Sequence, residues 1–341
     1  MTKAMAVALR DNARVLIIRM SALGDIIFAL EAVASLKEER PDVTVDFLVE
    51  DRFAGLLEGH PQLAKVLVFP RRTKWAIPAQ LWRLRRRKYD VVLDLHGNLK
   101  SSLQVLCSRG QLKLGFQSPV AREGSQYWYH RRVQVPQPLP HRAERGLFLL
   151  RELGLAGQPR RPVIPVRTDV PDCWADHPGT RVVLHPGTSE FAAFKRWPLD
   201  RFARLARQLA NHGCAVGLSH GPDERWMAEQ IRIEVPEAFS VGGDLGLRGL
   251  AAVLRDADVV VAADTGPLHI AAAMDTRVVA LFGPKEVSWF GPRGEGHAIL
   301  FHDVPCRPCL RRRCASAQCV LGLGVETVAN AVLQTAAATV R

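Results

Sequence analysis

Residues 14–39, RVLIIRMSALGDIIFALEAVASLKEE, decide the fold class. The apolar run 14–19 has the length and β-branched content of a buried strand, and a short polar turn at residues 21–25 follows it. Residues 26–39 then repeat apolar side chains with helical spacing, and Pro41 ends the helix. A buried strand followed at once by a helix is the opening unit of a parallel α/β sheet.

The alternation of strand and helix continues and then restarts after a linker at 155–180, which contains five prolines. We therefore predict an α/β protein with two doubly wound, Rossmann-like domains, residues 1–165 and 166–341, facing across a cleft. Ligands of such folds bind at the carboxyl ends of the strands. The further strands are expected at 44–49, 66–69, 90–95, 181–184, 214–218, 258–262 and 277–282, and the further helices at 198–211 (Pro198 near its first residue), 223–232, 247–255, 267–274 and 325–339.

The charge of the chain is strongly basic and unevenly distributed. Among 341 residues, 46 Lys and Arg against 34 Asp and Glu give a formal charge of +12. Residues 61–160 hold 19 of the basic and 5 of the acidic side chains, so the surplus belongs to the first half. Such a surplus predicts an anionic partner: nucleic acid, an anionic membrane surface or a phosphorylated substrate.

Composition excludes several classes of protein. With 48% hydrophobic and 23% charged residues, the chain is neither a disordered tail nor a fibre. No apolar run approaches the roughly 18 residues of a membrane span, and the first 20 residues lack the apolar region of a secretory signal. We expect a cytoplasmic protein, in which the seven cysteines do not form a disulfide framework.

The turn Ser21-Ala22-Leu23-Gly24-Asp25 is the first candidate site. It matches neither the glycine-rich dinucleotide fingerprint nor a Walker A loop, so phosphate binding at this turn is not supported. Asp25 lies near the start of the predicted helix. It is either an N-cap residue or a carboxylate aimed into the cleft as a general base, and the residues alone do not separate these readings.

Two motifs in the second half follow predicted strands. His185-Pro186-Gly187-Thr188-Ser189 offers amides and hydroxyls for a phosphate, to which Lys195 would add a positive charge; the alternative is a loop that merely turns the chain. Trp197 is expected in the core. The second motif is Asp264-Thr265-Gly266-Pro267-Leu268-His269, which is predicted to join a strand to a helix through a tight turn. The amides of Thr265 and Gly266 at the start of that helix would favour an anion. An ordinary capped turn and a packed core histidine are the alternatives.

A cluster of basic residues with Trp75 and Trp82 among them lies in the first half. No nucleic-acid-binding motif accompanies it, so no nucleic acid partner is expected. A phosphorylated lipid head group at a membrane surface fits equally well, and a solvated helix face would explain the run 85–88. The cluster consists of Arg71, Arg72, Lys74, Arg83, Arg85, Arg86, Arg87 and Lys88.

Four cysteines, Cys306, Cys309, Cys314 and Cys319, have the spacing C-x2-C-x4-C-x4-C. The first pair has the spacing of a metal knuckle, and four thiolates would hold a structural Zn or Fe ion. The later spacings do not match the usual two-knuckle ribbon, and reduced thiols in a loop are the alternative reading.

Taken together, these motifs resemble glycosyltransferase family 9, the ADP-heptose:lipopolysaccharide heptosyltransferases, and within it most closely the heptosyltransferase I branch. The resemblance extends over about residues 15–285 in family order. It is carried by RVLIIRMSALGDIIFAL, DLHGNLKSS, GFQSPVAREG, HPGTSEFAAFKRWP and DTGPLHIAAAMDTRVVALFGP.

The resemblance implies a GT-B fold and an inverting transfer of L-glycero-D-manno-heptose from ADP-heptose onto Kdo of Kdo-lipid A. Asp25 would be the general base, and Lys195 would stabilise the leaving diphosphate. The other implied acceptor contacts are Ser21, Lys100 and Arg122. The implied donor contacts are Thr188, Ser189, Lys195, Asp264, Thr265, Gly266 and His269, with Asp223 or Glu224 on the ribose.

Three further expectations follow from the resemblance. No cofactor is required, because positive side chains and a helix terminus would replace a divalent ion at the leaving group. The enzyme would be peripheral on the cytoplasmic face of the inner membrane, at an anionic inner-leaflet surface. The alternative function is a family relative that transfers heptose to the second inner-core position or to a protein.

Overall fold

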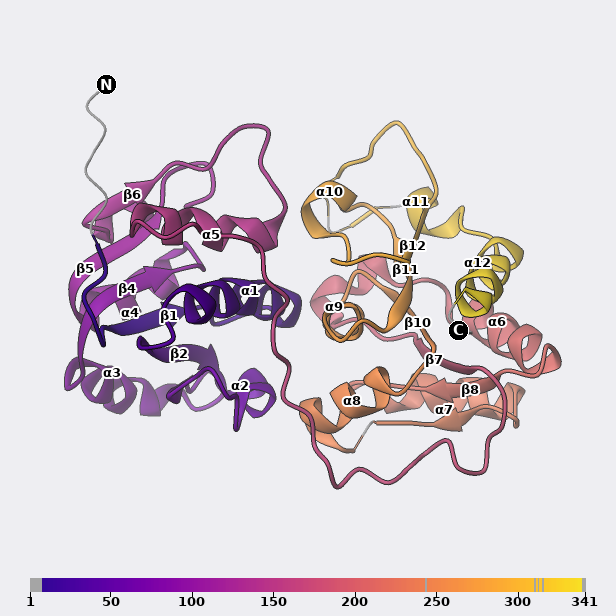
Figure 1. Ribbon diagram of the computed structural model, residues 1–341. Helices are drawn as coiled ribbons and strands as arrows, with labels where there is room; N and C mark the ends of the chain where they lie inside the picture. The colour runs from indigo at the N-terminus through magenta and orange to yellow at the C-terminus, as the bar shows by residue number, and fades with distance from the viewer. Residues whose placement is uncertain (1–7, 243, 310, 312, 315, 339–341) are drawn as a thin grey trace. The chain divides into compact units, whose positions relative to one another are not determined.

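The protein is described here by a computed structural model covering residues 8–242, 244–309, 311, 313–314 and 316–338 (Figure 1). Contacts within the chain divide it into two compact units, Met1–Pro165 and Val166–Arg341. Each unit contains a six-stranded parallel sheet with helices on both faces, which confirms the predicted α/β class with two doubly wound sheets.

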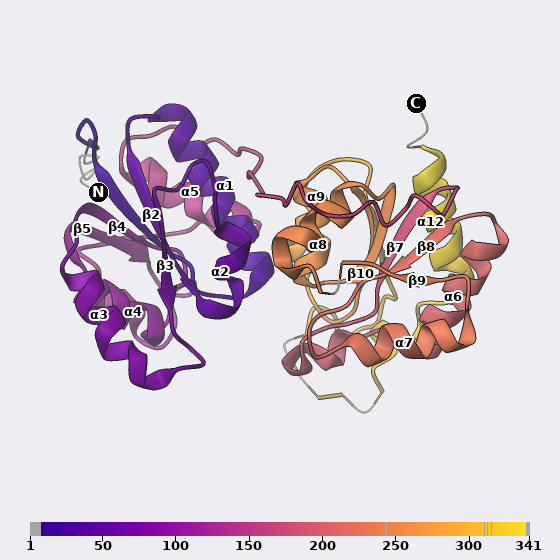
Figure 2. The ribbon, with the colours of Figure 1, turned by 90° about the horizontal axis from the view of Figure 1, so that it is seen from below.

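The sheet of the first unit has the strand order β3-β2-β1-β4-β5-β6. Helices α1 and α5 pack against each other on one face of this sheet, and α3 and α4 pack against each other on the other (Figure 2). Strand β1 is central because its five residues are almost wholly apolar and buried. The elements are β1 (Arg14–Ile18), α1 (Leu23–Glu39), β2 (Thr44–Glu50), α2 (Asp51–Leu57), β3 (Lys65–Phe69), η1 (Lys74–Ala76), α3 (Ile77–Arg85), β4 (Lys88–Asp94), α4 (Leu99–Cys107), β5 (Arg109–Phe116), η2 (Ser125–Trp128), β6 (Arg131–Val133) and α5 (Arg142–Glu152).

The sheet of the second unit has the order β12-β11-β10-β7-β8-β9. Helix α6 packs between α7 and α12, and α8 packs against α9. Trp197 is fully buried in the core under α6 and donates its indole N–H to the Leu323 carbonyl at 3.0 Å, which confirms it as a core residue. The elements are β7 (Arg181–His185), η3 (Glu190–Lys195), α6 (Leu199–Asn211), β8 (Ala215–Leu218), α7 (Arg225–Glu234), β9 (Phe239–Ser240), α8 (Gly246–Arg255), β10 (Val259–Ala263), α9 (Gly266–Ala273), β11 (Arg277–Phe282), α10 (Val287–Phe290), β12 (Ala298–Phe301), α11 (Gln318–Leu321) and α12 (Val325–Ala337).

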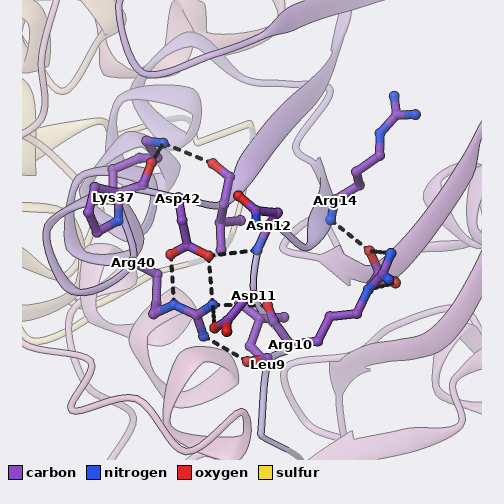
Figure 3. A network of polar contacts seen from close by, with 11 residues as sticks. Leu9, Arg10, Asp11, Asn12, Arg14, Lys37, Arg40 and Asp42 are labelled. Atoms are coloured by element: carbon purple, nitrogen blue, oxygen red, sulfur yellow. Dashed lines mark hydrogen bonds and ion pairs between the residues drawn. The ribbon is translucent and has the colours of Figure 1, made fainter.

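Polar contacts close the amino-terminal edge of the first sheet, away from the strand ends where ligands bind (Figure 3). The Arg40 guanidinium donates to both carboxylate oxygens of Asp42 and to the carbonyls of Leu9 and Arg10, at 2.7–2.9 Å. Asp42 also accepts the Asn12 amide at 2.7 Å. These contacts tie the segment before β1 to the end of α1, so this edge is structural.

Some element boundaries differ from the sequence predictions. Helix α1 begins at Leu23, three residues earlier than expected, and Pro198 is the N-cap of α6, outside its first turn. Strands β5, β6, β9 and β12 were not predicted. β5 alternates Arg, Gln and Lys with small or apolar residues, β6 and β9 have only three and two residues, and β12 is an apolar run of only four. Residue 339, the last of the predicted C-terminal helix, lies outside the described residues.

Candidate functional site

Asp25 lies at the carboxyl end of the first sheet, in the first turn of α1. Its carboxylate is held between two guanidinia: Arg19 Nη2 is 2.5 Å from Oδ2, and Arg142 Nη1 is 2.7 Å from Oδ1. Ala22 is the N-cap of α1 and Asp25 forms no capping hydrogen bond, so the N-cap reading of Asp25 is wrong. Burial alone would raise the pKa of the Asp25 carboxyl, but Arg19 and Arg142 more than offset it and lower that pKa far below its usual range. Asp25 is therefore ionised at neutral pH.

More positive charge surrounds Asp25 than one carboxylate neutralises. Arg145 lies one turn after Arg142 on α5, and repulsion from the Arg142 guanidinium lowers the pKa of Arg145. Burial is the larger cause, and together they lower the pKa of Arg145 to about 10, so it is still charged at neutral pH. Three partly buried guanidinia, those of Arg19, Arg142 and Arg145, thus lie near Asp25, and Arg19 is also influenced by the buried Asp94. An excess of positive charge in such surroundings favours an anionic ligand.

The turn after β4 carries His96 toward the same cluster. Burial, then Arg19 and Lys100, lower the pKa of His96 to about 3, so its imidazole is neutral at pH 7. Within the described residues, His96 Nδ1 is buried without a hydrogen-bond partner. A neutral imidazole with an unpartnered nitrogen can still form one more hydrogen bond.

Asp94, at the end of β4, organises this turn. It is fully buried and accepts the hydroxyls of Ser101 and Tyr129 at 2.7 and 2.8 Å and the amides of His96 and Gly97 at 2.8 and 3.1 Å. Asn98 caps α4 through a reciprocal hydrogen-bond pair with Ser101. The turn is rigid, and it fixes the start of α4.

Lys100, in the first turn of α4, contacts a second buried acid. Glu50 ends β2, is fully buried, and forms ion pairs with Lys100, with Arg52 at 3.0 Å and with Arg71 at 3.2 Å. Burial would raise the pKa of Glu50, but the hydrogen bond and charge of Lys100, followed by Arg52 and Arg71, lower it. The three cations are partly exposed, so they form a cationic surface next to the buried Glu50 carboxylate. Ser21 is half-buried in the turn after β1 and Arg122 is exposed.

In the second unit, Lys195 and Asp264 form an ion pair of low exposure. The ammonium of Lys195 also contacts the Asp264 carbonyl at 3.2 Å, and His269 Nε2 lies 3.3 Å from Asp264 Oδ1. Burial would raise the pKa of Asp264, but His269 and Lys195 lower it to about 2. Thr265 is the N-cap of α9 and Gly266 its first residue, so the positive end of this helix lies directly beside the ion pair.

The loop after β7 is joined to this group through neighbouring side chains. Lys195 binds Asp264, and Arg196 donates to the Thr188 carbonyl at 2.7 Å. The Thr188 hydroxyl is buried and, among the described residues, has no hydrogen-bond partner. Ser189, next to it, is exposed and is the N-cap of η3. A buried hydroxyl without a partner can still take up a hydrogen bond, and this one lies in a loop that Arg196 joins to the Lys195 segment.

Glu224, and not Asp223, faces this loop. Asp223 is exposed, whereas Glu224 is half-buried and its Oε2 accepts the Gly221 amide at 3.2 Å. A Cβ added at Gly187 would lie 2.1 Å from the same oxygen, so the carboxylate lies against the Gly187 backbone. Burial raises the pKa of Glu224. The position next to Thr188 must be glycine for this approach.

Comparisons with known proteins identify the family of the chain. The sequence model of glycosyltransferase family 9 (heptosyltransferase) matches residues 79–320. Lipopolysaccharide heptosyltransferase 1 of Pseudomonas aeruginosa is 30% identical, over 88% of this chain and 87% of its own length. The chain belongs to glycosyltransferase family 9.

Solved structures support the fold of this family 9 glycosyltransferase. The Escherichia coli heptosyltransferase WaaC with ADP is 24% identical and superposes with a TM-score of 0.76, covering 94% of this chain and 99% of its own. A family 9 glycosyltransferase from Veillonella parvula superposes with a TM-score of 0.84 at 18% identity, covering 97% and 99%. The two parallel six-stranded sheets are those of the GT-B fold.

The structure adds residues to the candidate site that were not singled out from the sequence. They are Arg19, Glu50, Arg52, Asp94, His96, Arg142 and Arg145. Four of them (Arg19, Glu50, Asp94 and His96) carry a recognisable signal, because a polar residue that ends or directly follows an apolar strand lies at the ligand-binding edge. Arg142 and Arg145 carry no such signal, since they begin a helix more than 100 residues after Asp25.

The four clustered cysteines of this glycosyltransferase lie in and after the segment that follows β12. The Arg311 amide is 3.3 Å from Cys309 Sγ and the Ala317 amide 3.3 Å from Cys314 Sγ. Burial, then Cys306 and Cys314, raise the pKa of the Cys319 thiol. In the part of the chain that the structure describes, no three His, Cys, Asp or Glu side chains are arranged to hold a metal ion. A structural metal at these cysteines stays a prediction.

Proposed function

We propose that this glycosyltransferase transfers L-glycero-D-manno-heptose from ADP-heptose onto a Kdo sugar of the lipopolysaccharide inner core, with inversion at the anomeric carbon. The observation that carries the proposal is the ionised Asp25 carboxylate, held by Arg19 and Arg142 in surroundings with excess positive charge. The names of the relatives support the donor and the pathway, because lipopolysaccharide heptosyltransferases are its matches over most of their length.

The second unit would bind the donor. The Lys195 ammonium has three N–H donors, and two of them face Asp264. Among the described residues the third has no partner, and it would bind a phosphate oxygen. The unpartnered Thr188 hydroxyl and the N-terminus of α9 would bind further phosphate oxygens. Glu224 would accept hydrogen bonds from the ribose, and Asp264 from the heptose. These groups stabilise the charge that develops as ADP leaves, the role for which a metal ion is otherwise used.

The first unit would bind the acceptor. Kdo carries a carboxylate and lipid A carries phosphates, and the clusters around Asp25 and Glu50 both have more positive than negative charge. Arg145, Arg122 and Lys100 are the proposed anion contacts. His96 Nδ1, neutral and unpartnered among the described residues, would contact a sugar hydroxyl.

Asp25 would take the acceptor proton late in the reaction. The acceptor oxygen forms its bond to the anomeric carbon while the bond from that carbon to the diphosphate oxygen breaks, and ADP leaves with the electron pair. The attacking hydroxyl becomes strongly acidic only as its new bond forms, so a carboxylate with a lowered pKa still accepts the proton. The ionised carboxylate also stabilises the positive charge of the oxocarbenium-like sugar.

The test is product formation with defined acceptors. The purified protein is incubated with ADP-heptose and, separately, with Kdo-lipid A, with an acceptor already carrying the first heptose, and with a protein acceptor. We expect ADP release and a heptosylated product with Kdo-lipid A alone. Transfer to either of the other acceptors, without transfer to Kdo-lipid A, would overturn the acceptor assignment.

A further inference from the structure

Exposed hydrophobic side chains are concentrated in one part of the first unit. Among the described residues, eight of the fourteen exposed large hydrophobic side chains lie between Val68 and Trp128. Trp75 is 84% exposed and Trp82 58% exposed. Single exposed hydrophobic residues are ordinary, but a group of this kind marks an interaction surface. On η1, α3, α4 and η2 these side chains are Trp75, Trp82, Leu99, Leu103, Leu106, Tyr127 and Trp128.

These side chains lie on helices that pack side by side. Helix α4 contacts both α3 and η2, and α3 and α4 cover the same face of the first sheet (Figures 1 and 2). On α4, Leu99, Leu103 and Leu106 are spaced i, i+4 and i+7, so they share the outer face, while Gln104 and Val105 face the core. Trp75 and Trp82 are seven residues apart, on η1 and α3. We call this outer surface the α3–α4 face.

The charge of the α3–α4 face is predominantly positive, although the exposed Glu123 accepts the Leu99 amide. Between residues 71 and 88 there are eight basic and no acidic side chains, and most of the basic ones are exposed. The Arg86 guanidinium lies 4.5 Å from the centre of the Trp82 ring, and the Arg132 guanidinium 5.4 Å from that of Tyr127. Aromatic and aliphatic side chains framed by Lys and Arg match the interface of an anionic bilayer, where rings enter the head-group region and cations meet lipid phosphates.

We propose that the α3–α4 face docks on an anionic phospholipid bilayer through Trp75, Trp82 and the leucines of α4. In the part of the chain described by the structure, no helix has both the length and the apolar character to span a bilayer. A second copy of this chain would bring the same positive surface against itself, which charge repulsion opposes. Nucleic acid would engage the cations but would leave the leucine row of α4 uncovered.

The place of this face explains its use, and this step rests on the proposed function. Lys100 lies in the first turn of α4, and Arg71 directly precedes the Trp75 segment, so the cationic cluster around Glu50 adjoins the docking face. A lipid acceptor in the bilayer would therefore present its charged sugar at the edge of the protein that already touches the membrane.

The experiment is flotation of the full chain with vesicles of phosphatidylcholine alone and of phosphatidylcholine mixed with phosphatidylglycerol. We expect binding to the mixed vesicles only, and weaker binding at high salt. The double variant Trp75→Ser/Trp82→Ser should bind about tenfold more weakly, and Arg83→Gln/Arg85→Gln/Arg86→Gln about a hundredfold more weakly at low salt. The matched control is Trp226→Ser, since Trp226 on α7 is 53% exposed and lies in the other unit.

Two additional measurements keep this inference separate from the proposed function. Bromine-labelled acyl chains should quench part of the tryptophan fluorescence of the native chain and less of that of the double variant. Heptosyl transfer to a deacylated, water-soluble acceptor should be unchanged in the double variant. Equal flotation of the native chain and the double variant, or stronger binding of duplex DNA than of mixed vesicles, would overturn the inference. Failure of heptosyl transfer with intact vesicle binding would overturn the proposed function alone.

Discussion

Arg142 donates to the Asp25 carboxylate at 2.7 Å although the two residues are 117 positions apart. This contact joins the start of α5 to the start of α1, and the two helices pack together along the same face of the first sheet. Since Arg19 forms an ion pair with the other carboxylate oxygen, two guanidinia stabilise the ionised form of Asp25.

Replacing Arg142 tests this stabilisation through the pH profile. Asp25 must be ionised to accept a proton, and its pKa is lowered by Arg19 and Arg142. The change Arg142→Gln removes one cation, so the pKa of Asp25 rises and activity is lost at a higher pH as the solution is acidified. The measurement is kcat/KM against pH for the native chain and for the variant.

Arg225→Gln is the matched control for that profile, because Arg225 pairs with Glu229 on the exposed side of α7. Its acidic limb should coincide with that of the native enzyme. An unchanged acidic limb in Arg142→Gln would show that Asp25 does not set the pH dependence.

Lys195 is expected to bind the diphosphate of the donor. Lys195→Gln removes an ammonium next to Asp264 and the start of α9, so we predict about tenfold to hundredfold weaker ADP binding. Adenosine, which has no phosphates, should bind the variant and the native chain equally. Calorimetric titration with both ligands makes the comparison, and equal losses for both would mean that the second unit is misfolded or that Lys195 contacts the nucleoside.

Gly187 tests the place of Glu224. A methyl group at this position would meet Glu224 Oε2, so Gly187→Ala displaces the carboxylate. We expect a higher KM for ADP-heptose, with the KM for the acceptor unchanged. Gly55→Ala is the control, because nothing lies within 4 Å of a Cβ added there. If Gly187→Ala had the same KM for ADP-heptose as Gly55→Ala, Glu224 would not contribute to donor binding.

Much of the fold was predictable because its strands are apolar runs bounded by turns. The predicted runs at 14–19, 44–49 and 277–282 correspond to β1, β2 and β11 within a residue or so at each end. The missed strands are short or charged; β5, for example, contains Arg109 and Lys113 and has no continuous apolar run.

The candidate site was predictable only where its residues lie close together in the chain. Asp264 and His269 are five residues apart and are in contact, whereas Glu50 and Lys100 meet across 50 residues and Asp25 and Arg142 across 117. The Glu50–Lys100 pair comes from strand order, which brings the ends of β2 and β4 to the same edge of the sheet, and the Asp25–Arg142 pair comes from the packing of α1 against α5. No local spacing records either pair. The choice between Asp223 and Glu224 likewise depended on which side chain faces the Gly187 backbone.

Glu50 is expected to contribute to stability as well as to acceptor binding. Glu50→Gln keeps the size of the side chain but leaves Lys100, Arg52 and Arg71 without their shared partner, so we predict a loss of about 1–3 kcal/mol in the free energy of unfolding at neutral pH. Because the folded-state pKa of Glu50 is lowered, its contribution is complete above the unfolded pKa and disappears as pH falls through the lowered value. Urea denaturation at neutral and acidic pH measures this difference.

The exposed pair of Glu229 with Arg225 offers the control for that series, since Glu229→Gln should change the unfolding free energy by less than about 0.5 kcal/mol. A Glu50→Gln protein as stable as Glu229→Gln at neutral pH would contradict the role of Glu50. The role of Glu50 would also be contradicted if the difference in unfolding free energy between Glu50→Gln and the native chain increased as the pH falls.

The role of Asp25 as the base is tested most directly by the turnover of Asp25→Asn together with its affinity for ADP-heptose. Asparagine keeps the shape of the side chain but accepts no proton, so kcat should fall by a factor of about a hundred to ten thousand while the donor binds as before. Circular dichroism and the thermal midpoint would confirm that the variant is folded despite the loss of the ion pairs with Arg19 and Arg142. Turnover close to that of the native enzyme in a folded Asp25→Asn protein would contradict the assignment of Asp25 as the base.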